Sequence, residues 1–497
     1  MLNPMTYHLG TLAAQPVVSF AISAGSPMMR YRNGIKIQQG WFPWVVEILA
    51  VTALAYALSG RDRTKRWWLC WVPVAALVAF GVLWAVYHYI EENGLAGDPA
   101  PSALWFWVGV SGAALAVLVL GWRGQWWGRR AVALLAVPLC LLSTGVVVNQ
   151  WVGYYKTLEQ AWDELTAGPL PNEVSAADLP ALQGTTQTAG RVVPVDIPND
   201  ASRFTHRTEY VYLPPAWFAS KQPPQLPVVM MIGGEFDTPS HWIRVGDAAD
   251  IADKFAAEHD GNAPIMVFVD TSGSFNTDSE CVNGPRGNSE DHLTKDVPPY
   301  VVSKFGASED PAKWGVVGWS MGGTCAVNLA ARHPDLFSGF VDIAGDIRPS
   351  AGDEATTVKH LFGGDKAAYD SYAPLNAINA HGRYDRTAGW FQTSSTPMKA
   401  PKGQKPKPAA ANAGNVGFGG YDPGGFAGSG DYLGAARKLC HAGEQHGIQC
   451  SVIVKPGRHT WDFASSAYRD ALPWLAGYLG TPGVPPSPLP ASTPATQ

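Results

Sequence analysis

The chain has 497 residues, a formal net charge of −5 at pH 7 and only 15% charged residues. This length is enough for two or three domains with a sizeable core. The charge balance gives no basic field, and no run of Lys and Arg is interleaved with aromatic residues, which argues against nucleic acid as a partner.

Four long apolar stretches occupy the first part of the chain. They cover residues 41–60, 67–90, 103–121 and 131–151. Each is close to the roughly 20 residues that a helix needs to cross the hydrocarbon core of a bilayer. Tryptophans cluster at their ends, where indole rings favour the membrane interface. The pattern predicts an all-α domain of four transmembrane helices over residues 41–151, with the lipid bilayer as its partner. Buried helices of a soluble domain are the alternative, but four such stretches would rarely follow one another.

The loops between these stretches indicate an orientation, because Lys and Arg accumulate on the cytoplasmic side. The first and third loops carry the positive residues, which are Arg61, Arg63, Lys65, Arg66, Arg123, Arg129 and Arg130. The second loop has only the acidic residues Glu91, Glu92 and Asp98. We therefore expect a multi-pass plasma-membrane protein in which everything after residue 151 lies outside the cytoplasm.

The N-terminal segment, residues 1–40, is then extracytoplasmic as well. Its residues Arg30, Arg32 and Lys36 conflict with that orientation. Residues 9–29 are moderately apolar but are interrupted by Gln, Pro and Gly. They predict a partly buried segment and not a fifth span, and they lack the basic start of a signal peptide.

The six cysteines form two groups. Cys70 and Cys140 lie inside predicted spans, where cysteine acts as a small apolar residue. The other four, Cys281, Cys325, Cys440 and Cys450, belong to the predicted external part, where disulfides can form. Cys440 and Cys450 flank a short turn and are the favoured bridge. No CxxC motif or His/Cys cluster indicates zinc, and we expect neither a metal nor a cofactor.

From residue 191 the pattern changes. Residues 152–190 are expected to be a linker with a short helix, and after them short apolar strands alternate with amphipathic helices. The predicted strands include RVVPVDIP, TEYVYLPP, VVMMIGG, IMVFVD, KWGVVGW, GFVDIAG, TAGWFQTS and CSVIVKPG. This alternation predicts a doubly wound α/β sheet over residues 191–480. A Pro/Lys/Gly-rich insertion interrupts it at about 397–430, and the Pro-rich tail 481–497 is expected to be disordered.

The stretch VVGWSMGG places Ser320 between two glycines, after an apolar strand and before a helix. A sharp strand-to-helix turn needs small residues on both sides, which explains Gly318 and Gly322. Such a turn raises the hydroxyl above the carboxyl end of the strand, and the helix N-terminus adds backbone N–H groups that can hold an oxyanion. The context predicts a nucleophile; a structural serine at a glycine turn is the alternative.

A serine nucleophile needs a base, which comes last in the chain order of this fold. His459 follows the strand CSVIVKPG near the end of the domain and is the predicted base. The acid that orients the imidazole should follow the strand TAGWFQTS. Asp431 is favoured and Asp422 is the alternative, with Asp346 and Asp385 behind them. Asp431 also precedes a helix, where an aspartate can act simply as the N-terminal cap.

Two further groups belong to the predicted site. The oxyanion hole should combine the N–H of Met321 with an N–H from Glu235 or Phe236, in the loop after VVMMIGG. Arg286, in the segment CVNGPRGNSED, can pair with a substrate carboxylate or phosphate. Its alternative role is to tie this segment to a nearby Asp or Glu.

With these residues in order, the region from about 191 to 480 resembles the esterase D family of α/β hydrolases, which includes the mycobacterial mycolyltransferases. VVMMIGG, GWSMGG and PGRHTWDFA carry the resemblance. DSECVNGPRGNSEDHLTKDVPPYV and the four N-terminal stretches are similar to a group of actinobacterial membrane-anchored esterases. The resemblance implies Ser320 as nucleophile, His459 as base, and Glu235 and Met321 as oxyanion donors. The acid cannot be carried over, because the insertion falls where it should lie.

The sequence therefore predicts a membrane-anchored serine esterase with an extracytoplasmic catalytic domain, acting on an acyl ester through a Ser-His-Asp triad and an acyl-enzyme. An acyltransferase that moves acyl chains onto cell-envelope sugars or glycolipids shares the first half-reaction and is the alternative. A catalytically inert transport or scaffold protein is an alternative of another class. The predicted spans hold no charged residue apart from Glu47, near an end, so an ion pathway has little support.

Overall fold

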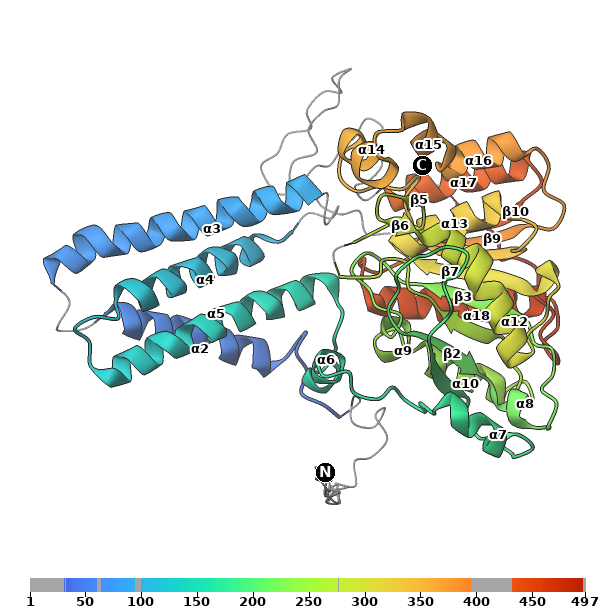
Figure 1. Cartoon of the computed structure of the whole chain (residues 1–497), viewed down its shortest axis with the longest axis horizontal. Helices are drawn as coiled ribbons and strands as arrows, with labels where there is room; N and C mark the ends of the chain where they lie inside the picture. The colour runs from blue at the N-terminus through green and yellow to red at the C-terminus, as the bar shows by residue number, and fades with distance from the viewer. Residues whose placement is uncertain are drawn as a thin grey trace, which may run out of the picture.

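The computed structural model describes residues 31, 33–59, 64–93, 100–275, 277–394 and 431–494. They form a helical bundle and an α/β domain, which lie side by side with helix α5 of the bundle running up to the α/β domain (Figure 1). The predicted segment 9–29 and the insertion at 397–430 lie outside the described residues.

The apolar bundle consists of four helices, α2 (Trp41–Leu58), α3 (Val72–Asn93, preceded by a π-helical turn Trp67–Trp71), α4 (Ser102–Leu120) and α5 (Trp127–Val152). All four predicted apolar stretches are therefore helical, and each helix is long and apolar enough to cross a membrane. α5 begins at Trp127 rather than at residue 131, so Arg129 and Arg130 lie in its first turn.

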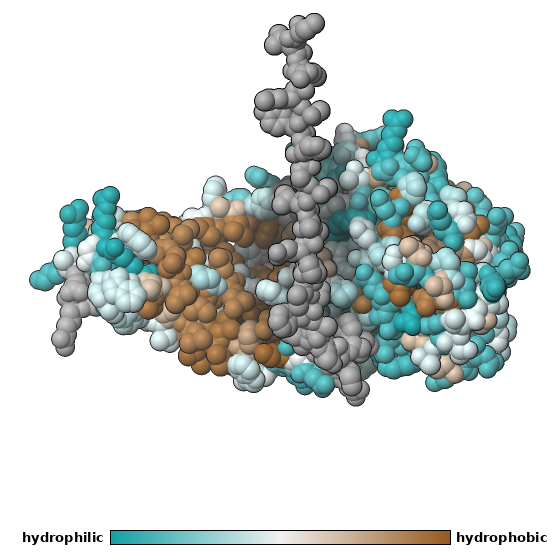
Figure 2. Space-filling model, turned by 60° about the horizontal axis from the view of Figure 1, so that its bottom comes forward, coloured by the Kyte–Doolittle hydropathy of each residue, from teal (hydrophilic) through white to brown (hydrophobic). Residues whose placement is uncertain are grey.

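Much of the bundle surface is apolar, as Figure 2 shows. Trp44, Leu69, Leu77, Phe80 and Leu135 are among its large exposed side chains. A continuous apolar surface of this kind is unfavourable in water and typical of contact with lipid or another protein. The charged and polar residues gather at the tip of the bundle and on the α/β domain (Figure 2).

Eight strands form one sheet in the order β1-β2-β4-β3-β7-β8-β9-β10. Their bounds are β1 Arg191–Val195, β2 Glu209–Leu213, β3 Val228–Ile232, β4 Ile265–Phe268, β7 Trp314–Trp319, β8 Gly339–Ile343, β9 Ala388–Ser394 and β10 Gln449–Lys455. β1 and β2 pair antiparallel, as do β2 and β4, and all other neighbours are parallel. A separate two-stranded ribbon joins β5 (Asn283–Gly284) and β6 (Gly287–Asn288).

Helices cover both faces of the sheet, and two apolar cores result. One core packs the sheet against α12 (Val297–Phe305), α13 (Met321–Arg332) and α17 (Tyr432–Gln445), and the other packs it against α10 (Ala248–Ala257) and α18 (Trp461–Tyr478). Parallel strands buried on both faces read as continuous apolar runs, which is why the sequence predicted them. The α/β-hydrolase type of doubly wound sheet is confirmed.

The remaining α-helices are α6 Leu158–Leu165, α7 Leu179–Leu182, α8 Pro215–Phe218, α9 His241–Arg244, α11 Ser289–Asp291, α14 Glu354–Phe362, α15 Lys366–Ser371 and α16 Pro374–His381.

Residues 490–493 of the C-terminal tail lie along the edge of the sheet, and residues 481–485 pack at the end of α18, so the prediction of disorder is wrong for these residues. The N–H of Thr493 donates to the carbonyl of Val452 at 2.8 Å, and the N–H of Val452 donates to Oγ of Ser492 at 3.0 Å. β10 is an edge strand, and its outer N–H and C=O groups need partners. The composition of the tail does not reveal that it pairs with a strand edge, because the edge of β10 is not part of the tail sequence.

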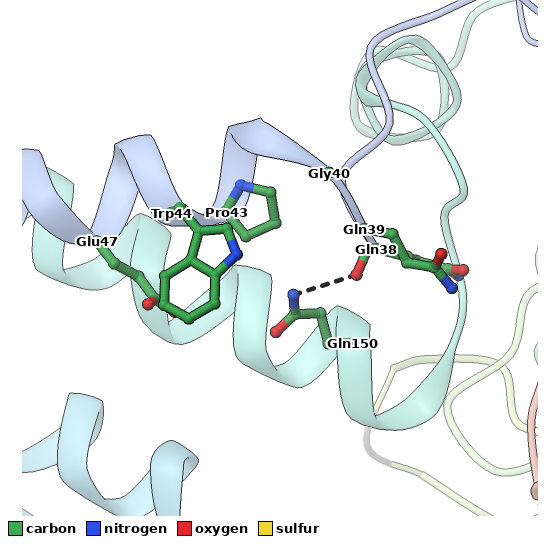
Figure 3. A pocket seen from close by; sticks show the side chains of 7 residues that line it. All are labelled: Gln38, Gln39, Gly40, Pro43, Trp44, Glu47 and Gln150. Atoms are coloured by element: carbon green, nitrogen blue, oxygen red, sulfur yellow. Dashed lines mark hydrogen bonds between the residues drawn. The ribbon is translucent and has the colours of Figure 1, made fainter.

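The first part of the segment expected to be a linker, up to α6, lies between the bundle and the α/β domain (Figure 1). α6 begins with a capping box between Thr157 and Gln160. The residues before α2 run beside it, since the N–H of Leu158 donates to the carbonyl of Ile35 at 2.8 Å. Figure 3 shows a pocket at the neighbouring end of the bundle, where the side-chain amide of Gln150 donates to the carbonyl of Gln38 at 3.1 Å. Residues 35–38 are thus fixed to the end of α5 and the residues that follow it.

Candidate active site

Ser320 lies at a strained turn between β7 and α13. Its φ of 56° and ψ of −121° are unfavourable for a residue with a side chain. A Cβ at Gly318 would lie 1.7 Å from the carbonyl oxygen of Gly322, and a Cβ at Gly322 would lie 2.4 Å from that of Gly233. The close approach of these backbones requires both glycines of the motif. The turn leaves Ser320 half-buried at the carboxyl end of β7.

His459 meets Ser320 from the loop after β10. Its Nε2 lies 2.9 Å from Oγ of Ser320, within the reach of a general base. The imidazole stacks with the rings of Trp319 and Tyr432, at centroid distances of 4.2 and 4.7 Å. These two rings restrict its rotation. Neither ring was predicted to belong to the site, although Trp319 stands inside the motif and Tyr432 follows Asp431.

The predicted acid Asp431 caps the N-terminus of α17. One of its carboxylate oxygens accepts a hydrogen bond from the N–H of Gly434 at 2.9 Å, which is the alternative role that the sequence offered. Its neighbour Tyr432 stacks on His459. Asp422 lies outside the described residues, as does the chain directly after β9. The identity of the acid therefore stays a prediction.

The loop after β3, residues 233–246, which we call the β3 loop, lies directly against Ser320. A Cβ at Gly234 would be 3.3 Å from Cβ of Ser320. Asp237 shapes the turn by accepting from the N–H of Gly234 at 2.6 Å, and Phe236 has a φ of 66°. The loop that carries Glu235 and the helix that begins at Met321 thus meet at the serine. A helix leaves its first N–H groups unused by its own carbonyls, so they can face an anion.

A disulfide ties the segment after β4 to the first turns of α13. It joins Cys281 to Cys325, with a Cα–Cα distance of 5.8 Å.

Arg286, in the same segment, donates to the carbonyl of Asp278, and its other terminal nitrogen lies 3.3 Å from Nδ1 of His360. Arg286 therefore ties this segment to Asp278 and His360, in keeping with the loop-tying role that was its alternative. The predicted bridge between Cys440 and Cys450 is also present.

Two buried carboxyl groups lie on this segment. Asp278 and Glu280 are each 5% exposed. Burial raises the pKa of Asp278 to about 6, and burial together with the Asp278 charge raises the pKa of Glu280 well above its usual range. Glu280 has a φ of 50° and Cys281 one of 54°, both unfavourable for residues with side chains. The disulfide and the packing around it hold this strained backbone in place.

The buried carboxyl group of Asp342, on β8, is the third of this kind. It is 2% exposed and accepts from the N–H of Gly345 at 2.7 Å. Burial raises its pKa from 3.8 to about 7. Because the folded state holds the proton more tightly than the unfolded state, this group stabilises the fold fully below about pH 4, and that contribution is lost as the pH rises through about 7.

We expect Asp342→Asn to be more stable than the wild type at pH 8, by about 1 to 4 kcal/mol, because the asparagine has no proton to lose. Denaturant unfolding of the full chain in detergent at pH 4 and pH 8 measures this. From pH 4 to pH 8 the free energy of unfolding should fall by more in the wild type than in Asp342→Asn. Asp353→Asn, at a partly exposed helix cap, is the control and should change with pH as the wild type does. An equal pH dependence in Asp342→Asn and the wild type would contradict the assignment.

Among the described residues, two groups of side chains have the composition of metal sites, namely His206 with Glu209 and His292, and Cys440 with Glu444 and Cys450. Both nitrogens of His206 already lie within 2.9 Å of backbone carbonyl oxygens. His292 lies 3.1 Å from Glu209 and 3.3 Å from Asp296. The first group is therefore a hydrogen-bonded ion cluster. In the second group the two sulfurs are bonded to each other, which removes the thiolates that a metal needs.

Part of the α/β domain is similar to known esterases. Residues 204–408, which include Ser320 and the β3 loop and end before His459, match the family described as "Putative esterase". An uncharacterized protein of Corynebacterium glutamicum is 29% identical over 347 residues, which is 67% of this chain and 78% of that protein. NocK of Nocardia uniformis subsp. tsuyamanensis, described as a "Putative esterase", is 29% identical over 185 residues, which is 33% of this chain and 47% of NocK.

Among solved structures, an S-formylglutathione hydrolase from Agrobacterium tumefaciens is similar with a TM-score of 0.45 and 18% identity, over 60% of this chain and 98% of that one. The family match supports an enzyme domain of the esterase type over residues 204–408.

Proposed function

We propose that the protein is a membrane-bound serine esterase with Ser320 as its nucleophile and His459 as its general base. The observation that carries this proposal is the distance of 2.9 Å between Nε2 of His459 and Oγ of Ser320, at a strained turn between a parallel strand and a helix. A serine hydroxyl is a weak nucleophile, and an imidazole in this position can remove its proton as it attacks. The esterase family match of the surrounding residues supports the same chemistry.

The reaction has two half-reactions. Oγ of Ser320 attacks the ester carbonyl carbon while Nε2 of His459 takes the hydroxyl proton, and the carbonyl oxygen becomes an oxyanion. The N–H of Met321 and an N–H of Glu235 or Phe236 stabilise it. The intermediate collapses, the alcohol leaves with the proton from His459, and the acyl group stays on Ser320. Water, activated by His459, then releases the acid. Asp431, or Asp422 in its place, orients the imidazole.

The proposed location is the plasma membrane, with the α/β domain outside the cytoplasm. Four helices that are long and apolar enough to span a bilayer support the membrane, and the positive residues of the first and third loops support the orientation. The two disulfides of the α/β domain give independent support, because disulfides persist in oxidising compartments and are rare in the cytosol.

A fluorophosphonate probe is expected to label Ser320 in the purified full chain, and an activated fatty-acyl ester should then give free acid as the product. Adding a disaccharide separates the esterase from the acyltransferase. An acylated sugar at the expense of free acid would assign the protein to the transferases, whereas an unchanged product confirms hydrolysis. Failure of the probe to label folded protein would contradict both and favour the inert scaffold.

A further inference from the structure

The residues that follow α5 contact the β3 loop at several points. We call residues 153–168 the junction segment. The hydroxyl of Tyr154 donates to the carbonyl oxygen of Glu235 at 3.1 Å, and the hydroxyl of Tyr155 lies 3.2 Å from Nε2 of His241. Farther along, the Glu164 carboxylate accepts from the guanidinium of Arg244 at 2.9 Å. The loop that lies against Ser320 is therefore attached along its length to a segment that belongs to neither the sheet nor its helices.

The junction segment also contacts the loop that carries His459. A Cβ at Gly153 would lie 2.7 Å from Cβ of Thr460, the residue after His459. The ammonium of Lys156 lies 3.2 Å from the carboxylate of Asp462 and 2.9 Å from that of Asp247. The first four residues after α5 thus reach both loops that flank Ser320.

The contact of Tyr154 is made with a particular peptide unit. The carbonyl of Glu235 and the N–H of Phe236 belong to one planar trans peptide, so they point in opposite directions. Phe236 has a φ of 66°, and a residue with a side chain keeps that conformation only where its surroundings impose it. By holding the carbonyl of Glu235, Tyr154 fixes the plane of this peptide and hence the direction of the Phe236 N–H.

The chemistry of Tyr154 suits this role. Burial, the charges of the nearby Asp237 and Glu235 carboxylates and hydrogen bonding to Asp237, itself part of the β3 loop, raise the pKa of its hydroxyl well above the ordinary 10. The hydroxyl therefore stays protonated and remains a donor. The ring of Tyr154 also lies 5.2 Å from that of His241, so the phenol is held by packing as well as by its hydrogen bond.

We propose that Tyr154 is a positioning residue of the active site, which orients the Glu235–Phe236 peptide so that the β3 loop presents its N–H groups to the oxyanion formed on Ser320. This inference rests on the proposed esterase function. It gives the end of the apolar bundle a part in the reaction, because the residue that orients this peptide lies two positions beyond α5.

The test is Tyr154→Phe in the full chain in detergent, which removes the hydroxyl and keeps the ring. We expect kcat for an activated ester to fall about tenfold or more, with KM changed less than about twofold, because the lost interaction acts in the transition state. A boronic acid that forms a tetrahedral adduct with the serine should bind more weakly by the same factor. If Tyr154 had only a structural role, Tyr154→Phe would not weaken the binding of the boronic acid while leaving KM unchanged.

Tyr384→Phe is the matched control. Tyr384 is 2% exposed, and its hydroxyl donates to the carbonyl of Ala331 at 2.8 Å, so this variant also removes a hydroxyl-to-carbonyl hydrogen bond. It should keep the kcat and the boronic acid affinity of the wild type. Tyr155→Phe loosens the junction segment without touching Glu235 and should retain most activity.

Three outcomes would overturn the inference. Unchanged kcat and boronic acid affinity in Tyr154→Phe, in an active protein labelled at Ser320, would refute it and leave the esterase function standing. If Tyr155→Phe lost as much kcat and boronic acid affinity as Tyr154→Phe, the junction segment would act only through general packing. A wild type that neither hydrolyses the ester nor reacts with a fluorophosphonate would remove the proposed function itself, and the inference with it.

Discussion

Ser320→Ala is expected to lower kcat for an activated ester on the order of 10⁵-fold, because the acyl-enzyme cannot form without the hydroxyl. The His459→Ala variant should lose a similar factor, and combining the two should cost little more, since the pair acts as one unit. Steady-state kinetics of the full chain in detergent, together with loss of fluorophosphonate labelling, measure this.

Ser303→Ala is the control for this experiment, because Ser303 carries an exposed hydroxyl on α12. The activity of this variant should equal that of the wild type. The melting temperature of Ser320→Ala should stay close to that of the wild type, because alanine keeps the Cβ and the same strained backbone. Residual activity within about tenfold of the wild type would exclude Ser320 as the nucleophile.

Gly322→Ala is expected to lower the free energy of unfolding by about 3 kcal/mol or more and to abolish labelling of Ser320. The added Cβ would lie 2.4 Å from the carbonyl oxygen of Gly233 and 2.5 Å from that of Ile232. Both are backbone atoms of the neighbouring strand end, which cannot move aside without displacing the β3 loop. Denaturant unfolding and probe labelling of the same preparation would report both effects.

The matched control for the glycine is Gly145→Ala, in α5. A Cβ there meets no atom within 4 Å, so the variant should fold and react as the wild type does. A Gly322→Ala protein that is stable and fully labelled would contradict the close approach of α13 to the end of β3.

Most of the fold could be predicted because its strands are buried on both faces. VVMMI, IMVF and WGVVGW are continuous apolar runs, and each lies in the sheet as expected. The proximity of Ser320 and His459 could be predicted for a related reason, since the carboxyl ends of parallel strands meet at one edge of the sheet. The bundle was predictable from the length and composition of its helices.

What the sequence could not predict depends on contacts between distant segments. Nothing local marks Tyr154 as a partner of Glu235, because the hydrogen bond joins residues 81 positions apart. The pairing of Cys281 with Cys325, separated by 44 positions, likewise requires the fold. The tail at 490–493 was misjudged because its partner is an unpaired strand edge, which exists only once the sheet has formed.

The left-handed glycine that ends α5 has a consequence for how far the enzyme can reach. Gly153, at φ 71° and ψ 30°, turns the chain from the helix onto Thr460 without an intervening tether. In the proposed membrane-bound state the catalytic centre would therefore stay at one height above the bilayer and could not swing outward. Its rate would then follow the density of substrate in the plane of the membrane more closely than the concentration in the surrounding fluid.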